Sequence, residues 1–380
     1  MALRAPVETH AVASHRSRAV TGWVAVFVGA PIACFVVNYA VQAAITAAPG
    51  SILPYAYQVL LNSGVNVVLA VSLQLINGYT GQFSLGHAGF MAVGAYTCAA
   101  LMHYARPVLI GATPGVAVAS LYFGAALLVS GLLAAVFGLV VGIPSLRLKG
   151  DYLAIVTLGF AEIIRVIILN TDSLGGARGF SDLDQLSSGL FWVLLTCVAV
   201  VIVTRNMVAS TRGLAFLAVG VDEIAAEAIG INTTRYKVSA FVVGAFFAGV
   251  AGALYTGVQA YLTPGIFDFV KSMEVVAMVV LGGLGSIPGA IVAAIGLTLL
   301  PELLRGGFMP GFVHDLIPGA VWSALPNWRM VIYSLILISA MLLQSKGQLL
   351  KRRRKPAPKL PGPPADVAAG NAPAPPGATP

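Results

Sequence analysis

Polar side chains and glycines crowd residues 77–90, NGYTGQFSLGHAGF, at the boundary between two long apolar runs. Gln82, Ser84 and His87 can form hydrogen bonds to water or to a small polar solute if the backbone there lines a cavity. A plainer interpretation is a tight turn followed by a helix whose small residues pack closely against a neighbour. The two interpretations are compatible, and the candidate path-lining residues are Gly81, Gln82, Ser84, Gly86 and His87.

Two charged residues, Glu162 and Arg165, stand three positions apart in the apolar run 152–170 and therefore share one face of a helix. Charges at membrane depth are costly, so they pair or mark a functional site. We favour an intrahelical pair that neutralises itself. The alternatives are a contact with the carboxylate or ammonium group of a substrate, which makes Glu162 a further path candidate, and a position near the membrane interface.

A third polar segment, Thr211–Lys237, separates two apolar runs. Residues 222–229 predict a short helix, because acidic side chains are favoured near a helix N-terminus and Gly230 fits the residue that ends one. Glu223 and Glu227, four positions apart, give this helix an acidic face. Such a segment is either an ordinary surface loop or an interaction helix for a cytoplasmic partner. Its candidate contact residues are Asp222, Glu223, Ala226, Glu227 and Gly230.

Apolar helices are the elements that must position these residues. Of the 380 residues, 58% are hydrophobic and only 9% are charged, and the mean hydropathy is +0.89. A soluble domain carries about 25% charged residues, so a water-soluble fold is excluded. A bilayer core needs roughly 20 apolar residues per helix, and this chain has many such runs rather than the short alternating segments of a β-barrel. We therefore predict an all-α polytopic membrane protein.

About ten membrane-spanning helices are expected, some of them broken or re-entrant. Gly282, Gly283 and Gly285 are the helix-break residues, because with Pro288 and Gly289 they interrupt one apolar stretch and divide it into two short spans or one broken passage. The expected spans are residues 22–46, 56–76, 84–105, 114–143, 152–170, 188–208, 236–257, 273–284, 288–304 and 328–345.

Basic residues predict the orientation of the chain. With both termini in the cytoplasm, cytoplasmic segments hold 16 of the 22 Lys and Arg residues, as the positive-inside rule requires. The chain then divides into a basic cytoplasmic N-terminus at 1–20, a transmembrane domain at 21–345 with a cytoplasmic loop at about 209–235, and a C-terminal segment at 346–380. This last segment starts with a basic stop and continues as a Pro- and Ala-rich tail that we expect to be disordered.

No catalytic or metal site is predicted. The three cysteines and the histidines lack paired ligand spacing. The motifs H-E-x-x-H and G-x-S-x-G are absent, and so is the phosphate-binding motif G-x-x-x-x-G-K-[ST]. This chain therefore cannot hold a nucleotide by the P-loop mechanism, and we expect no cofactor in it. The net charge of +8 lies mainly at the chain ends and in short loops, so it does not indicate a nucleic-acid partner.

In combination, several stretches resemble the LivM-type permeases of branched-chain amino acid ABC importers. The resemblance covers roughly residues 55–345. It implies an ABC importer permease fold in the bacterial inner membrane and inward transport of leucine, isoleucine and valine. The stretches are NGYTGQFSLGHAGFMAVGAYT, DYLAIVTLGFAEIIR, the glycines Gly175, Gly176 and Gly179, DEIAAEAIGIN with KVSAFVVGAFFAGVAGALY, and VVLGGLGSIPGA.

The resemblance also implies partners, namely a second, LivH-type permease, two cytoplasmic ATPase subunits that use ATP, and a periplasmic amino-acid-binding protein. Permeases of this kind dock a cytoplasmic loop into a cleft on the ATPase, and the matching stretch here is Glu223–Gly230. Its spacing between glutamate and glycine is one residue longer than the usual pattern.

Other functions stay open at this stage. An ion-coupled secondary transporter or channel needs several intramembrane carboxylates or paired repeats, which we do not find. An intramembrane enzyme lacks its motifs here. The strongest rival is the same importer machinery with another cargo, such as urea, short amides or aromatic acids, because related permeases share motifs across cargo.

Overall fold

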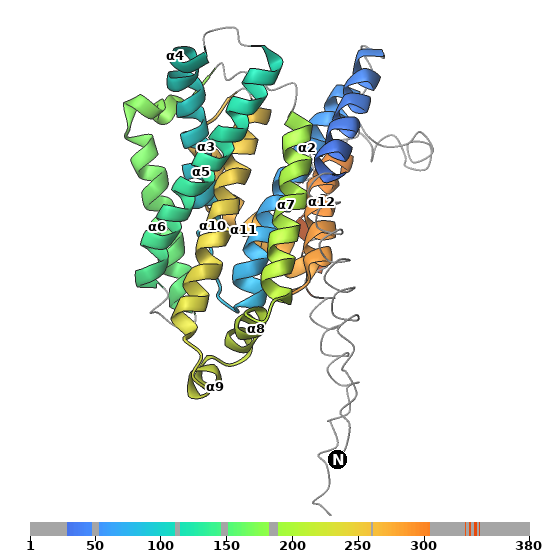
Figure 1. Ribbon diagram of the computed structural model, residues 1–380. Coiled ribbons are helices and arrows are strands. Elements are labelled where there is room, and N and C mark those ends of the chain that lie inside the picture. Colours follow the sequence, from blue (N-terminus) through green and yellow to red (C-terminus); the bar gives the residue numbers. More distant parts are fainter. Residues whose placement is uncertain are drawn as a thin grey trace, which may run out of the picture. The chain divides into compact units, whose positions relative to one another are not determined.

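The computed structural model describes residues 29–47, 53–110, 115–145, 151–181, 189–259 and 261–304, with a few helical positions between 331 and 342. The regular structure of these residues is helical apart from one isolated bridge between Phe180 and Leu262 (Figure 1). Two compact units are distinguished, Met1–Leu335 and Ile336–Pro380, and the fold below belongs to the first. The expected terminal segments 1–20 and 346–380 and most of the span 328–345 lie outside the described residues.

Short connections link the helices of this unit. Two of the elements, η1 and η2, are π-helices that continue or precede an α-helix without interruption, and the other η elements are short 3₁₀ turns. In chain order the elements are the helix Gly29–Ala47, α2 (Leu53–Leu73), η1 (Gln74–Tyr79), α3 (His87–Ala100), η2 (Leu101–Ala105), α4 (Arg106–Ile110), α5 (Val116–Ser145), α6 (Asp151–Leu169), η3 (Asp172–Leu174), η4 (Gly176–Arg178), α7 (Gly189–Ala209), α8 (Gly213–Val221), α9 (Glu223–Ala228), α10 (Thr233–Val258), η5 (Pro264–Phe267), α11 (Phe269–Gly282) and α12 (Ile287–Leu304).

Six helices among the described residues are long and apolar enough to cross a membrane, which confirms the all-α membrane protein. Three further expected spans are also helical, but their helices are shorter or more polar than these six. The 14 residues of α3 are mostly small and include several polar side chains, whereas α11 and α12 are two short helices that the glycine-rich residues 283–286 separate. The count of ten spans stays a prediction. The six are Gly29–Ala47, Leu53–Tyr79, Ala117–Ser145, Tyr152–Leu169, Gly189–Ala209 and Thr233–Val258.

The outward faces of α5 and α6 are apolar. Leu121 and Leu132 of α5 are 75% and 61% exposed, and Ile155 of α6 is 65% exposed. A monomeric soluble protein rarely leaves so large a contiguous apolar surface in water. These faces therefore suit a membrane surrounding rather than water.

The packing centres on α10, which contacts α2, α3, α5 and α7. Small residues allow the close approach, because a β-carbon at Gly94 of α3 would overlap the backbone of Gly249 in α10. Thr256 Oγ1 of α10 also donates a hydrogen bond to the carbonyl oxygen of Ala95 over 3.1 Å. Close backbone packing and interhelical hydrogen bonds are what hold helices together where lipid removes the hydrophobic driving force.

Two interruptions divide the helices of the membrane domain. Residues 80–86 separate η1 from α3, and residues 283–286 separate α11 from α12. Gly81, Gly283 and Gly285 have φ angles of 66°, 91° and 81°, which residues with a side chain rarely adopt. The break predicted from the glycines is therefore confirmed, and the two helices on either side of it, α11 and α12, pack against each other.

Candidate functional site

The irregular segment 80–86 and the start of α3 enclose polar side chains that are almost fully buried. Gln82 is 4% exposed, Ser84 0% and His87 1%. His87 Nε2 lies 2.8 Å from Ser72 Oγ of α2. Both side-chain amide atoms of Gln82, Ser84 Oγ and His87 Nδ1 have no hydrogen-bond partner in the described part of the chain. Buried polar atoms without a protein partner are rare, so this buried polar group is a candidate for polar contacts.

Side chains from two other helices hold the same segment in place. Thr157 Oγ1 of α6 accepts a hydrogen bond from the backbone N–H of Leu85 over 3.1 Å, and Ser272 Oγ of α11 accepts one from Ala88 over 3.3 Å. A β-carbon at Gly86 would overlap the carbonyl group of Thr157, so glycine is needed for this close approach. The segment is thus fixed between α2, α6 and α11.

The helix η1, which ends at the break 80–86, contacts the break 283–286. Gln74 Nε2 donates a hydrogen bond to the carbonyl oxygen of Gly283 over 2.8 Å. A β-carbon at Gly78 would lie 2.7 Å from the nitrogen of Gly285, and one at Gly282 would lie 2.5 Å from the backbone of the first turn of α12. Two of the three predicted break glycines, Gly283 and Gly285, therefore lie beside the helix that leads into the buried polar group, whereas Gly282 is the last residue of α11 and packs against α12.

The short helix predicted at 222–229 is confirmed as α9, with both of its ends defined by the expected residues. Asp222 is its N-cap, and the Oδ1 atom accepts hydrogen bonds from the N–H groups of Ile224 and Ala225 over 2.9 Å and 3.1 Å. Gly230 follows the helix with a φ of 85°, as a residue that ends a helix often does.

The acidic face of α9 is turned toward α10. Lys237 Nζ lies 2.5 Å from Glu223 Oε1, and Thr233 Oγ1 donates a hydrogen bond to Glu227 Oε1 over 2.7 Å. Glu223 and Glu227 are four positions apart on α9, and Thr233 and Lys237 are four positions apart on α10. The two contacts therefore lie one turn apart along both helices. Ala226 is buried at 2% exposure. These contacts fix α9 against the start of α10.

Large apolar side chains are exposed on α9 and at the end of α8. Ile224 is 72% exposed, Ile229 is 74% exposed, and Val221 at the end of α8 is 87% exposed. Large apolar side chains gathered on an exposed helix are typical of a protein contact. The exposed part of this segment therefore carries large apolar side chains together with the exposed acids Asp222 and Glu227.

Helix α8 joins α9 to the break after η1. A β-carbon at Gly220 would overlap the carbonyl oxygen of Tyr79, and one at Gly81 would lie 3.1 Å from the carbonyl oxygen of Gly220. Phe216 of α8 also packs in one buried cluster with Leu75 and Tyr79 of η1. The segment α8–α9 and the segment 80–86 therefore share a tightly packed backbone contact.

Glu162 forms the intrahelical pair that its spacing predicts. Its Oε2 atom lies 2.7 Å from Arg165 Nε, and the side chains are 37% and 29% exposed. Within the described part of the chain, Glu162 shares no hydrogen bond or ion pair with the group around Gln82. The structure therefore does not bring Glu162 together with the other path candidates.

Three residues of this site were missed by the sequence analysis. Ser72, Thr157 and Ser272 are each 1% exposed and all contact the segment that carries the path candidates. The only signal in the sequence is a single hydroxyl side chain within an apolar run, which many membrane helices contain for packing alone.

Sequence comparisons find a matching family and several relatives. The model of the family described as branched-chain amino acid transport system, permease component, matches residues 55–341. The chain is similar to the high-affinity branched-chain amino acid transport system permease protein LivM of Escherichia coli (strain K12), with 37% identity over 275 residues, 63% of this chain and 61% of that protein.

Two other relatives are informative. The permease protein LivH of the high-affinity branched-chain amino acid transport system of Salmonella typhimurium is 32% identical over 149 residues, 39% of this chain and 47% of LivH. The autoinducer 2 import system permease protein LsrC of Escherichia coli O9:H4 is 27% identical over 183 residues, 45% of this chain and 53% of LsrC. The chain thus spans 61% of the length of its LivM relative. No solved structure matches the chain.

Proposed function

Because this chain belongs to the family of branched-chain amino acid transport permeases, we propose that it is the membrane-spanning permease subunit of an ATP-binding cassette importer. Its cargo is leucine, isoleucine and valine. The family model covers residues 55–341, which include the buried polar group, both helix breaks and the segment α8–α9. The names of the relatives LivM and LivH support the cargo, because both describe permeases for branched-chain amino acids.

One observation carries the proposal, namely the chain of contacts from the exposed face of α9 to the buried polar group. Glu223 fixes α9 to α10, and Gly220 packs α8 against Tyr79. The buried polar group begins three residues later, at Gln82. A partner that moves α9 would therefore shift the backbone that carries this group, because packed elements move as rigid units.

Separate subunits supply the energy. The sequence has no phosphate-binding motif of the G-x-x-x-x-G-K-[ST] type, so two cytoplasmic ATPase subunits would bind and hydrolyse ATP. In our proposal the apolar surface of Ile224 and Ile229 docks into a cleft of one ATPase. Similarity to both LivM and LivH supports a pair of related permeases in the membrane, and a periplasmic binding protein would deliver the amino acid.

The translocation path in this proposal runs past the buried polar group. Gln82, Ser84 and His87 have unpartnered donor and acceptor atoms, which suit the ammonium and carboxylate groups of an amino acid. Gly81 and Gly86 supply the backbone conformation and the close packing of the segment. Glu162 stays a candidate for the path, with its charge balanced by Arg165.

Both termini lie in the cytoplasm in this proposal, as the basic residues indicate. A single cysteine at position 365, placed by Ala365→Cys in a chain whose three native cysteines are replaced, should react with a thiol reagent only after the membrane is made permeable. Reaction in intact cells with a reagent confined to the periplasm would overturn this orientation.

Reconstitution tests the function directly. The chain is combined in proteoliposomes with the second permease, the ATPase subunits and the binding protein, and uptake of labelled leucine is followed with and without ATP. We expect uptake only when this chain and ATP are both present, and no ATP hydrolysis by the chain alone. Uptake in vesicles that lack the chain, or ATP hydrolysis by the isolated chain, would refute the proposal.

A different cargo is the second candidate, because LsrC is described as a permease for autoinducer 2. Family membership alone therefore leaves the solute open. Competition by unlabelled solutes in the same vesicles decides between the two. Inhibition of leucine uptake by isoleucine and valine supports the branched-chain cargo, whereas inhibition by urea, short amides or aromatic acids but not by isoleucine or valine would favour the rival.

A further inference from the structure

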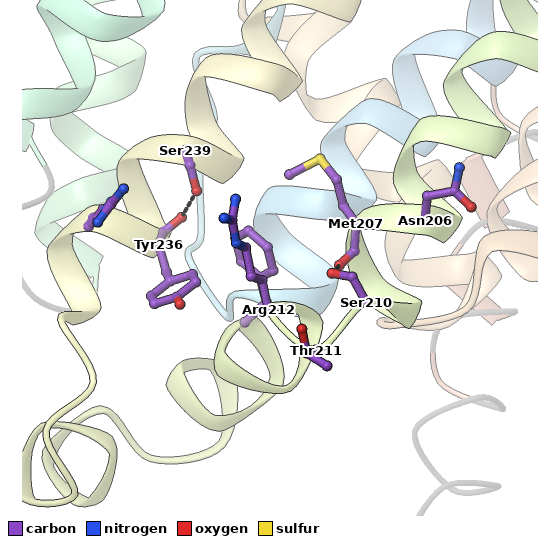
Figure 2. Close-up of a pocket in the computed structure, with 9 residues that line it drawn as sticks. Asn206, Met207, Ser210, Thr211, Arg212, Tyr236 and Ser239 are labelled. Carbon is purple, nitrogen blue, oxygen red and sulfur yellow. Dashed lines mark hydrogen bonds between the residues drawn. The ribbon is translucent and has the colours of Figure 1, made fainter.

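A cavity of about 660 Å³ lies where α7 ends, between α7, α8 and α10 (Figure 2). Two arginines line it, and Figure 2 shows Arg212 pointing into the space between Tyr236 and Met207. None of the lining residues is acidic. The lining residues are Asn206, Met207, Ser210, Thr211, Arg212, Phe216, Arg235, Tyr236 and Ser239.

The two guanidinium groups of this cavity are uncompensated. Neither Arg212 nor Arg235 has a side-chain hydrogen bond or ion pair with any residue that the structure describes. The nearby acid Glu223 is already bound to Lys237. Arginine forms two parallel hydrogen bonds to phosphate and carboxylate groups, so a cavity with two unpaired arginines is built for an anion.

Neutral polar side chains line the same cavity as the two arginines. Thr211 and Tyr236 add hydroxyl groups to the lining, so neutral hydrogen-bond donors accompany the two arginines. A phosphate group presents more oxygen atoms than a carboxylate. The donors therefore favour a phosphate ligand.

The position of the cavity selects the source of that phosphate. The apolar span of α7 ends at Ala209 and that of α10 begins at Thr233, so the cavity lies at the membrane boundary. Leu214 and Leu217 lie one turn apart on α8, the helix whose Phe216 lines the cavity, and are 69% and 40% exposed. A soluble anion gains nothing from such apolar neighbours, whereas a phospholipid brings acyl chains that cover them.

We propose that the Arg212–Arg235 cavity binds the phosphate headgroup of an anionic phospholipid. The two arginines hold the phosphate, and the acyl chains extend along the exposed leucines of α8. The bound lipid would lie against the same helix whose end contacts the break at Tyr79. This site is independent of the cargo and of the partners in the proposed function.

Lipid retention by the purified full-length chain tests this proposal. Native mass spectrometry measures bound phosphatidylglycerol, with phosphatidylcholine as the zwitterionic comparison. Arg212→Gln and Arg235→Gln should each weaken phosphatidylglycerol binding about fivefold, since each removes one of the two guanidinium groups that hold the phosphate in the cavity. The matched control is Arg205→Gln, which removes the same charge from α7 without lining the cavity and should retain lipid like the wild type.

Further measurements distinguish a phospholipid site from a site for a free anion and from a protein contact. Millimolar inorganic phosphate should leave the bound lipid in place, and displacement by phosphate would show a site for a free anion instead. Equal lipid retention by wild type and both variants, with weaker assembly of the ATPase subunits, would show a protein contact and refute the proposal. Arg212→Lys, which keeps the charge, should retain more lipid than Arg212→Gln. If the glutamine variants unfold, Tyr236→Phe and Thr211→Val serve instead, and each must lower phosphatidylglycerol retention in a folded chain.

Discussion

Gly220, at the end of α8, packs directly against the carbonyl oxygen of Tyr79, the last residue of the π-helix that leads into the buried polar group. No side chain fits between the two backbones. The contact brings together residues that are far apart in the sequence. It places the segment that ends in α9 next to the segment with the unpartnered polar atoms, so both must move together.

Gln82 should matter for uptake and not for folding. Gln82→Leu removes a buried amide whose two polar atoms have no partner, so the free energy of unfolding should stay the same or rise. Leucine uptake should fall, because the path loses a donor and an acceptor. Thermal unfolding and uptake are measured on the same preparation.

Ser72→Ala is a second variant in the same site, because Ser72 contacts the path candidate His87. It leaves His87 Nε2 without its partner, which should cost about 1–3 kcal/mol of stability. Normal uptake by a stable Gln82→Leu chain would remove Gln82 from the path.

Glu227 should act by holding α9 in position. Glu227→Arg replaces the acceptor of the Thr233 hydroxyl by a cation that stands near Lys237, so α9 should detach from α10. We expect ATP hydrolysis to continue while leucine uptake falls. Glu227→Gln keeps an acceptor for Thr233 and should behave nearly like the wild type. If Glu227→Arg transports normally in an assembled complex, the contact between α9 and α10 has no part in coupling.

Helix α9 should bind the ATPase through its apolar surface. Ile224→Asp places a charge on a side chain that is 72% exposed, so the chain itself should keep its stability while co-purification of the ATPase subunits fails. Val108→Asp is the control, since Val108 is 83% exposed on α4, at the opposite end of the helices from α9 (Figure 1). Normal ATPase assembly with Ile224→Asp would place the docking surface elsewhere.

Local features of this site were predictable from the sequence. The pair Glu162–Arg165 follows from a spacing of three residues on one helix, and the cap at Asp222 and the turn at Gly230 follow from residue types that prefer those positions. Gly283 and Gly285 predict the interruption between α11 and α12 because only glycine adopts their φ angles readily.

Contacts between distant segments were not predictable. In the sequence, nothing distinguishes Gly220 from the other glycines of apolar helices. Only the fold shows that Gly220 contacts Tyr79. The acidic face of α9 was a correct pattern, but its direction toward Thr233 and Lys237 depends on how the chain turns after Gly230. Such directions are set by tertiary packing and leave no periodic signal in one sequence.

The number of leucine molecules imported per ATP hydrolysed tests the central claim most directly. It is measured in proteoliposomes that contain the whole importer with wild-type chain, with Gly220→Ala, or with Gly296→Ala, whose added methyl group meets open space in α12. We predict that Gly220→Ala forces α8 away from Tyr79, so that ATP hydrolysis persists while the ratio falls by about fivefold or more, the lower end of typical coupling between sites. Gly296→Ala should keep the wild-type ratio. A wild-type ratio for Gly220→Ala in an assembled importer would contradict the account, because the contact between α8 and the helix break would then transmit nothing.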